Sequence, residues 1–90
     1  MDKPELIDKE DVISYHFLQV SKEESRVTRE KLERALRLGN EFKGKTRISF
    51  LTDQGPKLIE TTVWSVDEQF ILIKRGVEIP ISSIVDMEWQ

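Results

Sequence analysis

The chain has 90 residues, a formal net charge of −3 and no cysteine. A chain of this length forms one domain with a modest core, and the lack of cysteine excludes disulfides, thiolate nucleophiles and cysteine metal sites. The acidic balance argues against the strongly basic class of nucleic-acid binders. No membrane-length apolar run and no secretory leader is seen, so we expect a cytoplasmic protein without a membrane partner.

The N-terminal part divides into two predicted segments. Residues 1–11 are polar, contain Pro4 and are expected to form a flexible arm. Residues 12–20 are predicted to form a strand, because Tyr15, Phe17 and their β-branched neighbours are typical of strands. Apolar side chains fall on both alternations of this segment, so we expect it to pack on both sides.

A helix is predicted over residues 28–38. Thr28 can cap its N-terminus, with Val27 and Leu32 forming a hydrophobic staple. Gly39 is expected directly after the helix, at the position that favours a positive φ. One apolar stripe, spaced i, i+3, i+4, comprises Leu32, Ala35 and Leu36.

The pattern changes to a period of two over residues 45–89, which we expect to form a small β-barrel. Short strands are predicted at 45–51, 58–66, 70–74, 77–81 and 85–89, with a bend or bulge in the second. Pro80 belongs at a strand end or edge, and residues 82–84 suit one turn of 3₁₀ helix. The resulting fold is mainly β with one α-helix. It is a small five-stranded antiparallel barrel of SH3-like or Sm-like plan, preceded by an N-terminal strand and the helix, within a single domain of residues 1–90.

A family resemblance follows from this spacing. The helix followed by Ile48-Ser49-Phe50-Leu51, Lys57-Leu58, Ser65-Val66-Asp67, Phe70-Ile71-Leu72-Ile73-Lys74 and Ile81-Ser82-Ser83-Ile84-Val85 resembles the Sm-like family in the form of the bacterial RNA chaperone Hfq. The plan is also similar to that of the small Rho inhibitor Rof. The resemblance implies a small barrel that binds RNA. That family's Tyr-Lys-His motif, which helps to hold RNA, is replaced here by Glu78-Ile79-Pro80, so the resemblance carries the fold and not that RNA pocket.

No catalytic, metal-binding or cofactor-binding constellation is present in the sequence. His16 is the only histidine, so a histidine metal cluster or a catalytic triad is excluded. Pairs of carboxylates such as Glu23/Glu24 lie in polar connectors, and the four glycines are scattered. We therefore expect a protein that is not an enzyme and needs no metal or cofactor.

The main functional hypothesis is protein–protein interaction, including homo-oligomerisation. If Phe70 and Leu72 fill the barrel, Ile71 and Ile73 point outward and need cover. The helix stripe, residues 12–20 or a second subunit could supply it. The residues predicted to contact a protein partner are Ile71, Ile73, Tyr15, Phe17 and Trp89.

The alternative is an Sm-like RNA- or DNA-binding regulatory protein. Residues 21–38 hold six Lys or Arg against four Glu, the only positive excess along the chain. Pairing of Glu30 with Arg34 and of Glu33 with Arg37 would instead make this an ordinary solvated face. The residues predicted to contact nucleic acid are Arg29, Arg34, Arg37, Lys45 and Arg47.

Overall fold

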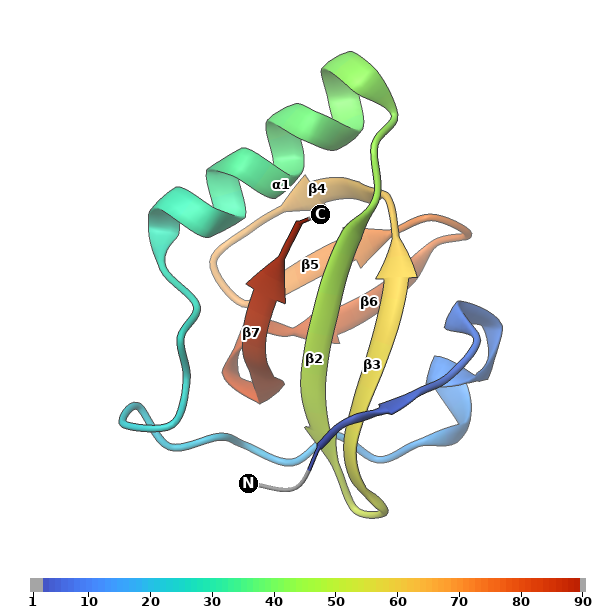
Figure 1. Cartoon of the computed structure of the whole chain (residues 1–90), viewed down its shortest axis with the longest axis vertical. Coiled ribbons are helices and arrows are strands. Elements are labelled where there is room, and N and C mark those ends of the chain that lie inside the picture. The colour runs from blue at the N-terminus through green and yellow to red at the C-terminus, as the bar shows by residue number, and fades with distance from the viewer. Residues whose placement is uncertain (1–2, 90) are drawn as a thin grey trace.

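The computed structural model describes residues 3–89, so the part of the predicted arm at residues 1–2 lies outside the described residues. The protein is mainly β with one α-helix, which lies across one end of the strands (Figure 1). The helix α1 spans Arg29–Phe42, and two 3₁₀ helices span Lys9–Ser14 (η1) and Ile81–Ser83 (η2). The strands are β1 Glu5–Leu6, β2 Thr46–Thr52, β3 Gly55–Thr61, β4 Val63–Val66, β5 Phe70–Ile73, β6 Val77–Pro80 and β7 Ile84–Glu88.

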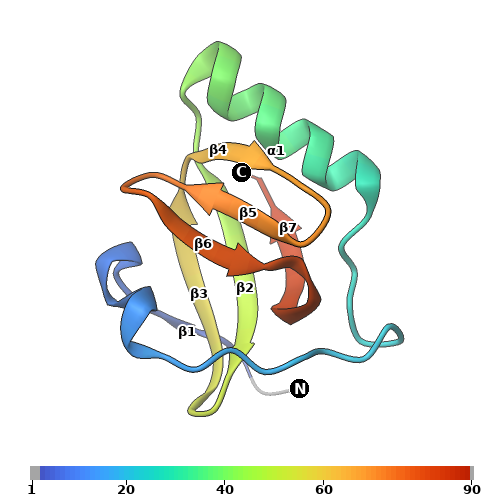
Figure 2. The same ribbon diagram turned by 180° about the vertical axis from the view of Figure 1, so that it is seen from behind.

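The strands form two sheets, with strand orders β1-β3-β2-β7 and β4-β5-β6, packed face to face (Figure 2). The chain passes from the first sheet to the second at Thr62, between β3 and β4. This is the bend expected within residues 58–66. The predicted mainly β fold with one helix is confirmed, but the strands make two sheets rather than a closed barrel. Pro80 ends β6, an edge strand, as predicted.

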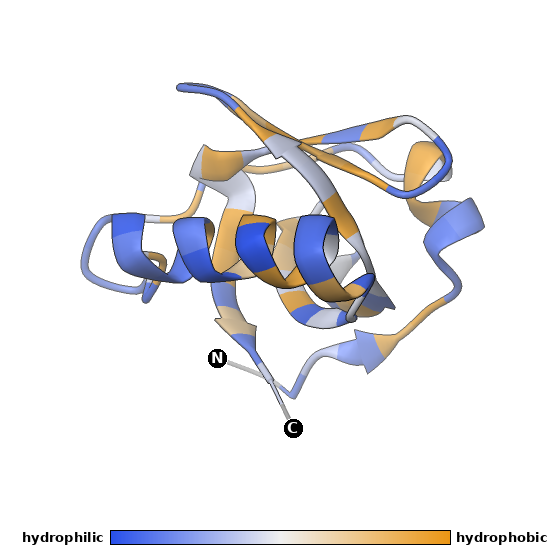
Figure 3. Ribbon diagram, turned by 90° about the horizontal axis from the view of Figure 1, so that it is seen from above, coloured by the Kyte–Doolittle hydropathy of each residue, from blue (hydrophilic) through white to orange (hydrophobic). Residues whose placement is uncertain are grey.

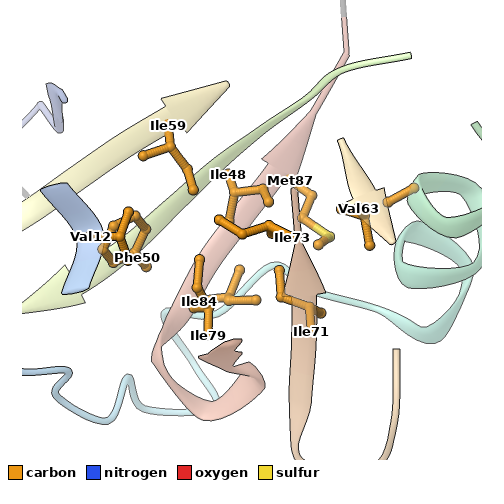
Figure 4. Packing of buried hydrophobic residues seen from close by; sticks show 11 residues of the cluster. Val12, Ile48, Phe50, Ile59, Val63, Ile71, Ile73, Ile79, Ile84 and Met87 are labelled. Atoms are coloured by element: carbon orange, nitrogen blue, oxygen red, sulfur yellow. The ribbon is translucent and has the colours of Figure 1, made fainter. Parts of the chain in front are cut away.

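The core lies between the two sheets (Figure 4). Alternate residues of β2 point into it, and Ile48 and Phe50 are buried as their period predicts. A bulge in the pairing of β2 with β7 places both Ile84 and Met87 in the core, although strict alternation would separate them. The buried cluster comprises Val12, Ala35, Ile48, Phe50, Ile59, Val63, Ile71, Ile73, Ile79, Ile84 and Met87.

Strand β5 turns its other face to the core. Ile71 and Ile73 are 0% exposed, whereas Phe70 and Leu72 are only partly buried. The prediction that Ile71 and Ile73 point outward is therefore wrong. Both alternations of this strand are apolar, so its period could not decide which face is inside. The position of β5 in the middle of the second sheet, over the core, decides it.

The predicted strand over residues 12–20 does not form. Residues 9–14 make η1, which Asp8 caps by accepting a hydrogen bond from the Glu10 N–H at 3.1 Å. Residues 15–20 are extended but cross the end of the sheets instead of joining one (Figure 1). Their one bridge joins Phe17 to Thr52. The apolar residues that suggested a strand pack at separate places. Val12 is part of the core, and Phe17 packs on Phe50 with ring centroids 5.7 Å apart.

The described part of the predicted arm is attached to the first sheet. Strand β1 pairs in parallel with β3, and the Lys57 ammonium lies 2.6 Å from a Glu5 carboxylate oxygen. The same ammonium lies 5.3 Å from the centroid of the Tyr15 ring. The hydrogen bond to Glu5 raises the pKa of Lys57 above the ordinary value for a lysine. The prediction of a flexible arm is thus wrong for residues 5–7, because Lys57 holds this segment against β3.

Helix α1 begins as predicted but ends later. The Thr28 hydroxyl accepts the Lys31 N–H at 3.1 Å, which confirms it as the N-cap. Gly39 lies inside the helix, and a Cβ there would overlap the Val63 carbonyl oxygen of β4. The glycine therefore allows the helix to pack closely on β4. The left-handed capping position at the end of the helix is occupied by Lys43, whose φ is 52°. Seen from above, hydrophilic residues predominate on the outer side of the helix (Figure 3).

The close approach at Gly39 makes a direct test of this packing. On an exposed helix Gly→Ala raises stability by about 1 kcal/mol, but at Gly39 we expect a loss of about 1–3 kcal/mol because the added methyl group meets Val63. Urea unfolding of Gly39→Ala measures the effect. Asn40→Ala, at the exposed neighbouring position, is the control and should be neutral or stabilising. A Gly39→Ala protein more stable than the wild type would contradict the close contact.

Candidate functional site

A groove of about 480 Å³ lies between the second half of α1 and the ends of the neighbouring strands. It is called here the basic groove. Figure 1 shows how its walls meet: the chain passes from α1 through a short connector into β2, and β7 runs toward the helix. The residues that line it are Arg34, Arg37, Leu38, Phe42, Gly44, Lys45, Arg47, Glu60 and Trp89.

Cationic side chains dominate the basic groove. Arg34 and Arg37 lie one helical turn apart on one face of α1, and Arg47 lies in β2, two residues after Lys45 of the α1–β2 connector. Glu60 is the single carboxylate among the lining residues, which gives a formal balance of four cations to one anion. The chain as a whole carries −3. Four of the 14 basic residues of this acidic protein therefore meet in one groove.

Four of the five residues predicted to contact nucleic acid meet in this groove. They are Arg34, Arg37, Lys45 and Arg47, whereas Arg29 at the start of α1 does not line it. The ion pairs expected between Glu30 and Arg34 and between Glu33 and Arg37 are not among those formed in residues 3–89. The guanidinium groups of Arg34 and Arg37 and the ammonium of Lys45 thus remain available to an anion.

Trp89 forms a fixed wall of the groove. Its indole N–H donates to the Thr46 hydroxyl oxygen at 2.9 Å, and the Arg34 guanidinium lies over its ring, 4.4 Å from the centroid. The contact with the ring orients Arg34 without neutralising its charge. Trp89, which was predicted to contact a protein partner, lies among the cations of the basic groove.

Arg47 and Glu60 form an imperfect pair across β2 and β3. The Arg47 Nε lies 3.2 Å from a Glu60 carboxylate oxygen, and the two residues face each other in the strand register. The N–H is not aligned with that oxygen, so the buried Nε has no hydrogen-bond partner in the described part of the chain. Both side chains are partly exposed, at 35% and 40%. The exposed parts of the Arg47 guanidinium and the Glu60 carboxylate can therefore form hydrogen bonds with a ligand.

Phe42 and Glu60 are groove residues that the sequence reasoning missed. Phe42 is 70% exposed, an unusual degree of exposure for a phenylalanine. A helix ending at Leu38 leaves Phe42 in a loop, whereas the observed helix places Phe42 one turn after Leu38, on the groove side. The i, i+4 spacing of these two apolar residues was the signal available in the sequence.

The other predicted partner-contacting residues lie outside the groove. Ile71 and Ile73 are buried in the core. Tyr15 is half-buried beneath the Lys57 ammonium, and Phe17 is half-buried against Phe50. The predicted protein-contacting set is therefore not brought together as one surface.

Two shallower hollows adjoin the basic groove. One shares Lys45 and Glu60 with it and continues to Lys9. The other shares Arg47 and continues over the outer face of the first sheet toward Arg26. A bound chain could thus leave the groove in two directions, where it would meet Lys9 with Asp8 on one side and Arg26 with Asp86 and Glu88 on the other.

Between residues 3 and 89, no three His, Asp or Glu side chains are grouped so that they could hold a metal ion. Over the same residues, no helix is long and apolar enough to cross a membrane.

Comparison of the chain with protein-family models, with curated protein sequences and with solved structures gave no match.

Two facing threonines test the role of the Trp89 wall. Thr46 and Thr61 are buried and directly opposite each other in β2 and β3, but only Thr46 accepts the indole N–H, while the Thr61 hydroxyl has no partner in the described residues. Thr46→Val should cost about 1–3 kcal/mol, because the indole N–H loses its acceptor. Thr61→Val, the control, should be neutral or stabilising. Urea unfolding and exchange of the Trp89 indole proton measure this, and equal effects of the two substitutions would contradict it.

Proposed function

We propose that this protein is a non-enzymatic binding module that holds single-stranded nucleic acid in the basic groove. The observation that carries the proposal is the meeting of four cations, from α1, the α1–β2 connector and β2, with the exposed ring of Phe42. Sites for single-stranded nucleic acid combine a positive groove for the phosphates with aromatic rings on which bases stack.

The parts of the groove suit these two tasks. Arg37 and Lys45 are exposed and suited to phosphate oxygens, while Phe42 offers a stacking face at the edge of the groove. Arg34, held over Trp89, offers a second planar group. The volume of about 480 Å³ suits one or two nucleotides, with neighbouring ones passing over the adjoining hollows. Affinity would then be modest and salt-dependent.

We further propose that the fold is a member of the SH3-like or Sm-like barrels in a more open form. Support comes from the bend at Thr62, which divides one long strand segment between two sheets, and from the single turn η2 before the last strand. Residues 78–80, where the Sm-like family carries its Tyr-Lys-His motif, remain Glu-Ile-Pro. The proposed nucleic-acid surface is therefore the groove beside α1 and not the pocket implied by the resemblance.

Charge reversal in the groove tests nucleic-acid binding. Arg37→Glu combined with Lys45→Glu should weaken binding of an unstructured single-stranded RNA by more than tenfold and reduce the slope of log K against log salt by about 2. Fluorescence anisotropy at several salt concentrations measures both quantities. A matched control, Lys22→Glu with Lys74→Glu, makes the same change of net charge at exposed sites outside the groove and should bind nearly as well as the wild type. If wild-type protein binds neither RNA nor single-stranded DNA at low salt, the proposal is wrong.

Protein–protein interaction, including self-association, stays as a second proposed function, supported by a different observation. Ile71 and Ile73 no longer support it, but the N-terminal segment exposes three large apolar side chains: Leu6, Ile13 and Leu18. Ile13 is 80% exposed at the end of η1. A second copy of the chain or another protein would remove these groups from water at about 25 cal/mol per Å².

Light scattering coupled to size-exclusion chromatography tests self-association. A dimer or larger species in the wild type, returned to the monomer mass by Ile13→Ser, is the expected result if this surface mediates it. Trp64→Ser is the control, since Trp64 is also exposed but lies in β4. A wild type that stays monomeric at high concentration removes self-association from consideration.

A further inference from the structure

Among the described residues, Glu60 is the one carboxylate that lines the basic groove, and its presence there calls for an explanation. A carboxylate beside a phosphate is repulsive, so Glu60 weakens a site that serves phosphate alone. Glu60 also does not satisfy Arg47, because the Arg47 Nε at 3.2 Å is left without an aligned hydrogen bond. At 40% exposure, the Glu60 carboxylate can accept hydrogen bonds from a ligand in the groove.

We infer that Glu60 and Arg47 select guanine among the bases that enter the groove. The Watson–Crick edge of guanine carries two adjacent N–H donors, at N1 and N2, followed by the O6 acceptor. A carboxylate accepts two parallel N–H groups, and a guanidinium beside it can donate to the carbonyl oxygen. The side-by-side Glu60 and Arg47 present this complementary order of acceptors and donor.

The other bases do not match this pair. Adenine and cytosine each place a ring-nitrogen acceptor beside their exocyclic amine, so a lone pair would face the Glu60 carboxylate. Uracil has one N–H between two carbonyl groups, one of which would face the carboxylate. The mismatch would leave partly buried polar groups unpaired, which is the usual source of strong discrimination by a hydrogen-bonding site.

The remaining groove residues fit the same arrangement. Phe42 supplies the stacking face for the base, while Arg37 and Lys45 supply charge for the flanking phosphates. The inference rests on the proposed nucleic-acid-binding function and adds base selectivity to it. Glu60 and Arg47 are thus specificity-determining residues, and the remaining cations give affinity without sequence preference.

The test uses four heptanucleotides of RNA that are oligouridine except for a central G, A, C or U. Fluorescence anisotropy should show the G-containing oligonucleotide bound roughly tenfold more tightly than the other three. Central inosine, which lacks the N2 amine, should lose much of this advantage. Glu60→Gln should bring all four to similar affinity.

Glu78→Gln, at an exposed site on β6 outside the groove, is the matched control and should keep the preference for G. Equal binding of the four oligonucleotides by wild-type protein would overturn the inference and leave the proposed function standing. A preference for G that survives Glu60→Gln, or one that inosine fully retains, would also overturn it. If none of the oligonucleotides binds, the proposed function fails and base selectivity fails with it. The inosine measurement uses unaltered protein, so it holds even if Glu60→Gln does not fold.

Discussion

The passage of the chain through Thr62 is the constraint on which the rest of this structure depends. Residues 55–66 would make one long strand, but at Thr62 the chain leaves the first sheet and enters the second. The Thr62 carbonyl oxygen accepts the Lys74 N–H at 2.9 Å, so the bend is tied to the end of β5. Ile59 and Val63, on either side of the bend, are both fully buried. One continuous segment thereby closes one end of the core.

The bend also determines where the helix and the groove lie. Because β4 turns away from β3, its outer side is free to receive α1, and Gly39 allows the helix backbone to reach the Val63 carbonyl group. The helix then overhangs the ends of β2 and β3, where Lys45 and Glu60 are found. The basic groove is the space between the helix and these strand ends. Its cations are brought together by packing at Gly39 and Val63, which carry no charge themselves.

Local features of this fold could be predicted from the sequence, and features set by tertiary contacts could not. The cap at Thr28 follows from side-chain chemistry, and the inward face of β2 follows from a period in which only one alternation is apolar. In β5 both alternations are apolar, so the local sequence pattern does not show which face is buried. Ile71 and Ile73 face the core because of the way the two sheets pack, and this packing cannot be read from β5 alone. Gly39 looks like a helix terminator because its real partner, Val63, is distant in sequence.

The same division holds for the candidate site. The basic residues of α1 and β2 could be chosen from the sequence because charges at i, i+3 and i, i+2 share a face whatever the tertiary fold. Their common groove, and the places of Phe42, Glu60 and Trp89 in it, required the packing of α1 over the strands. The prediction of Ile71 and Ile73 as contact residues failed with the assignment of the β5 face on which it rested.

The net charge of −3 does not oppose an anionic ligand in this groove. At physiological ionic strength the Debye length is about 8 Å, so charges farther away along the surface are largely screened. The potential at a phosphate bound in the groove would be set by the nearby charges, which are four cations, Glu60, and Glu88 facing Arg47 across the β2–β7 pairing. The remote acidic residues act chiefly by limiting how far a long polyanion can follow the surface. A short, positive and partly aromatic groove on an acidic protein favours recognition of a few nucleotides over general binding along a strand.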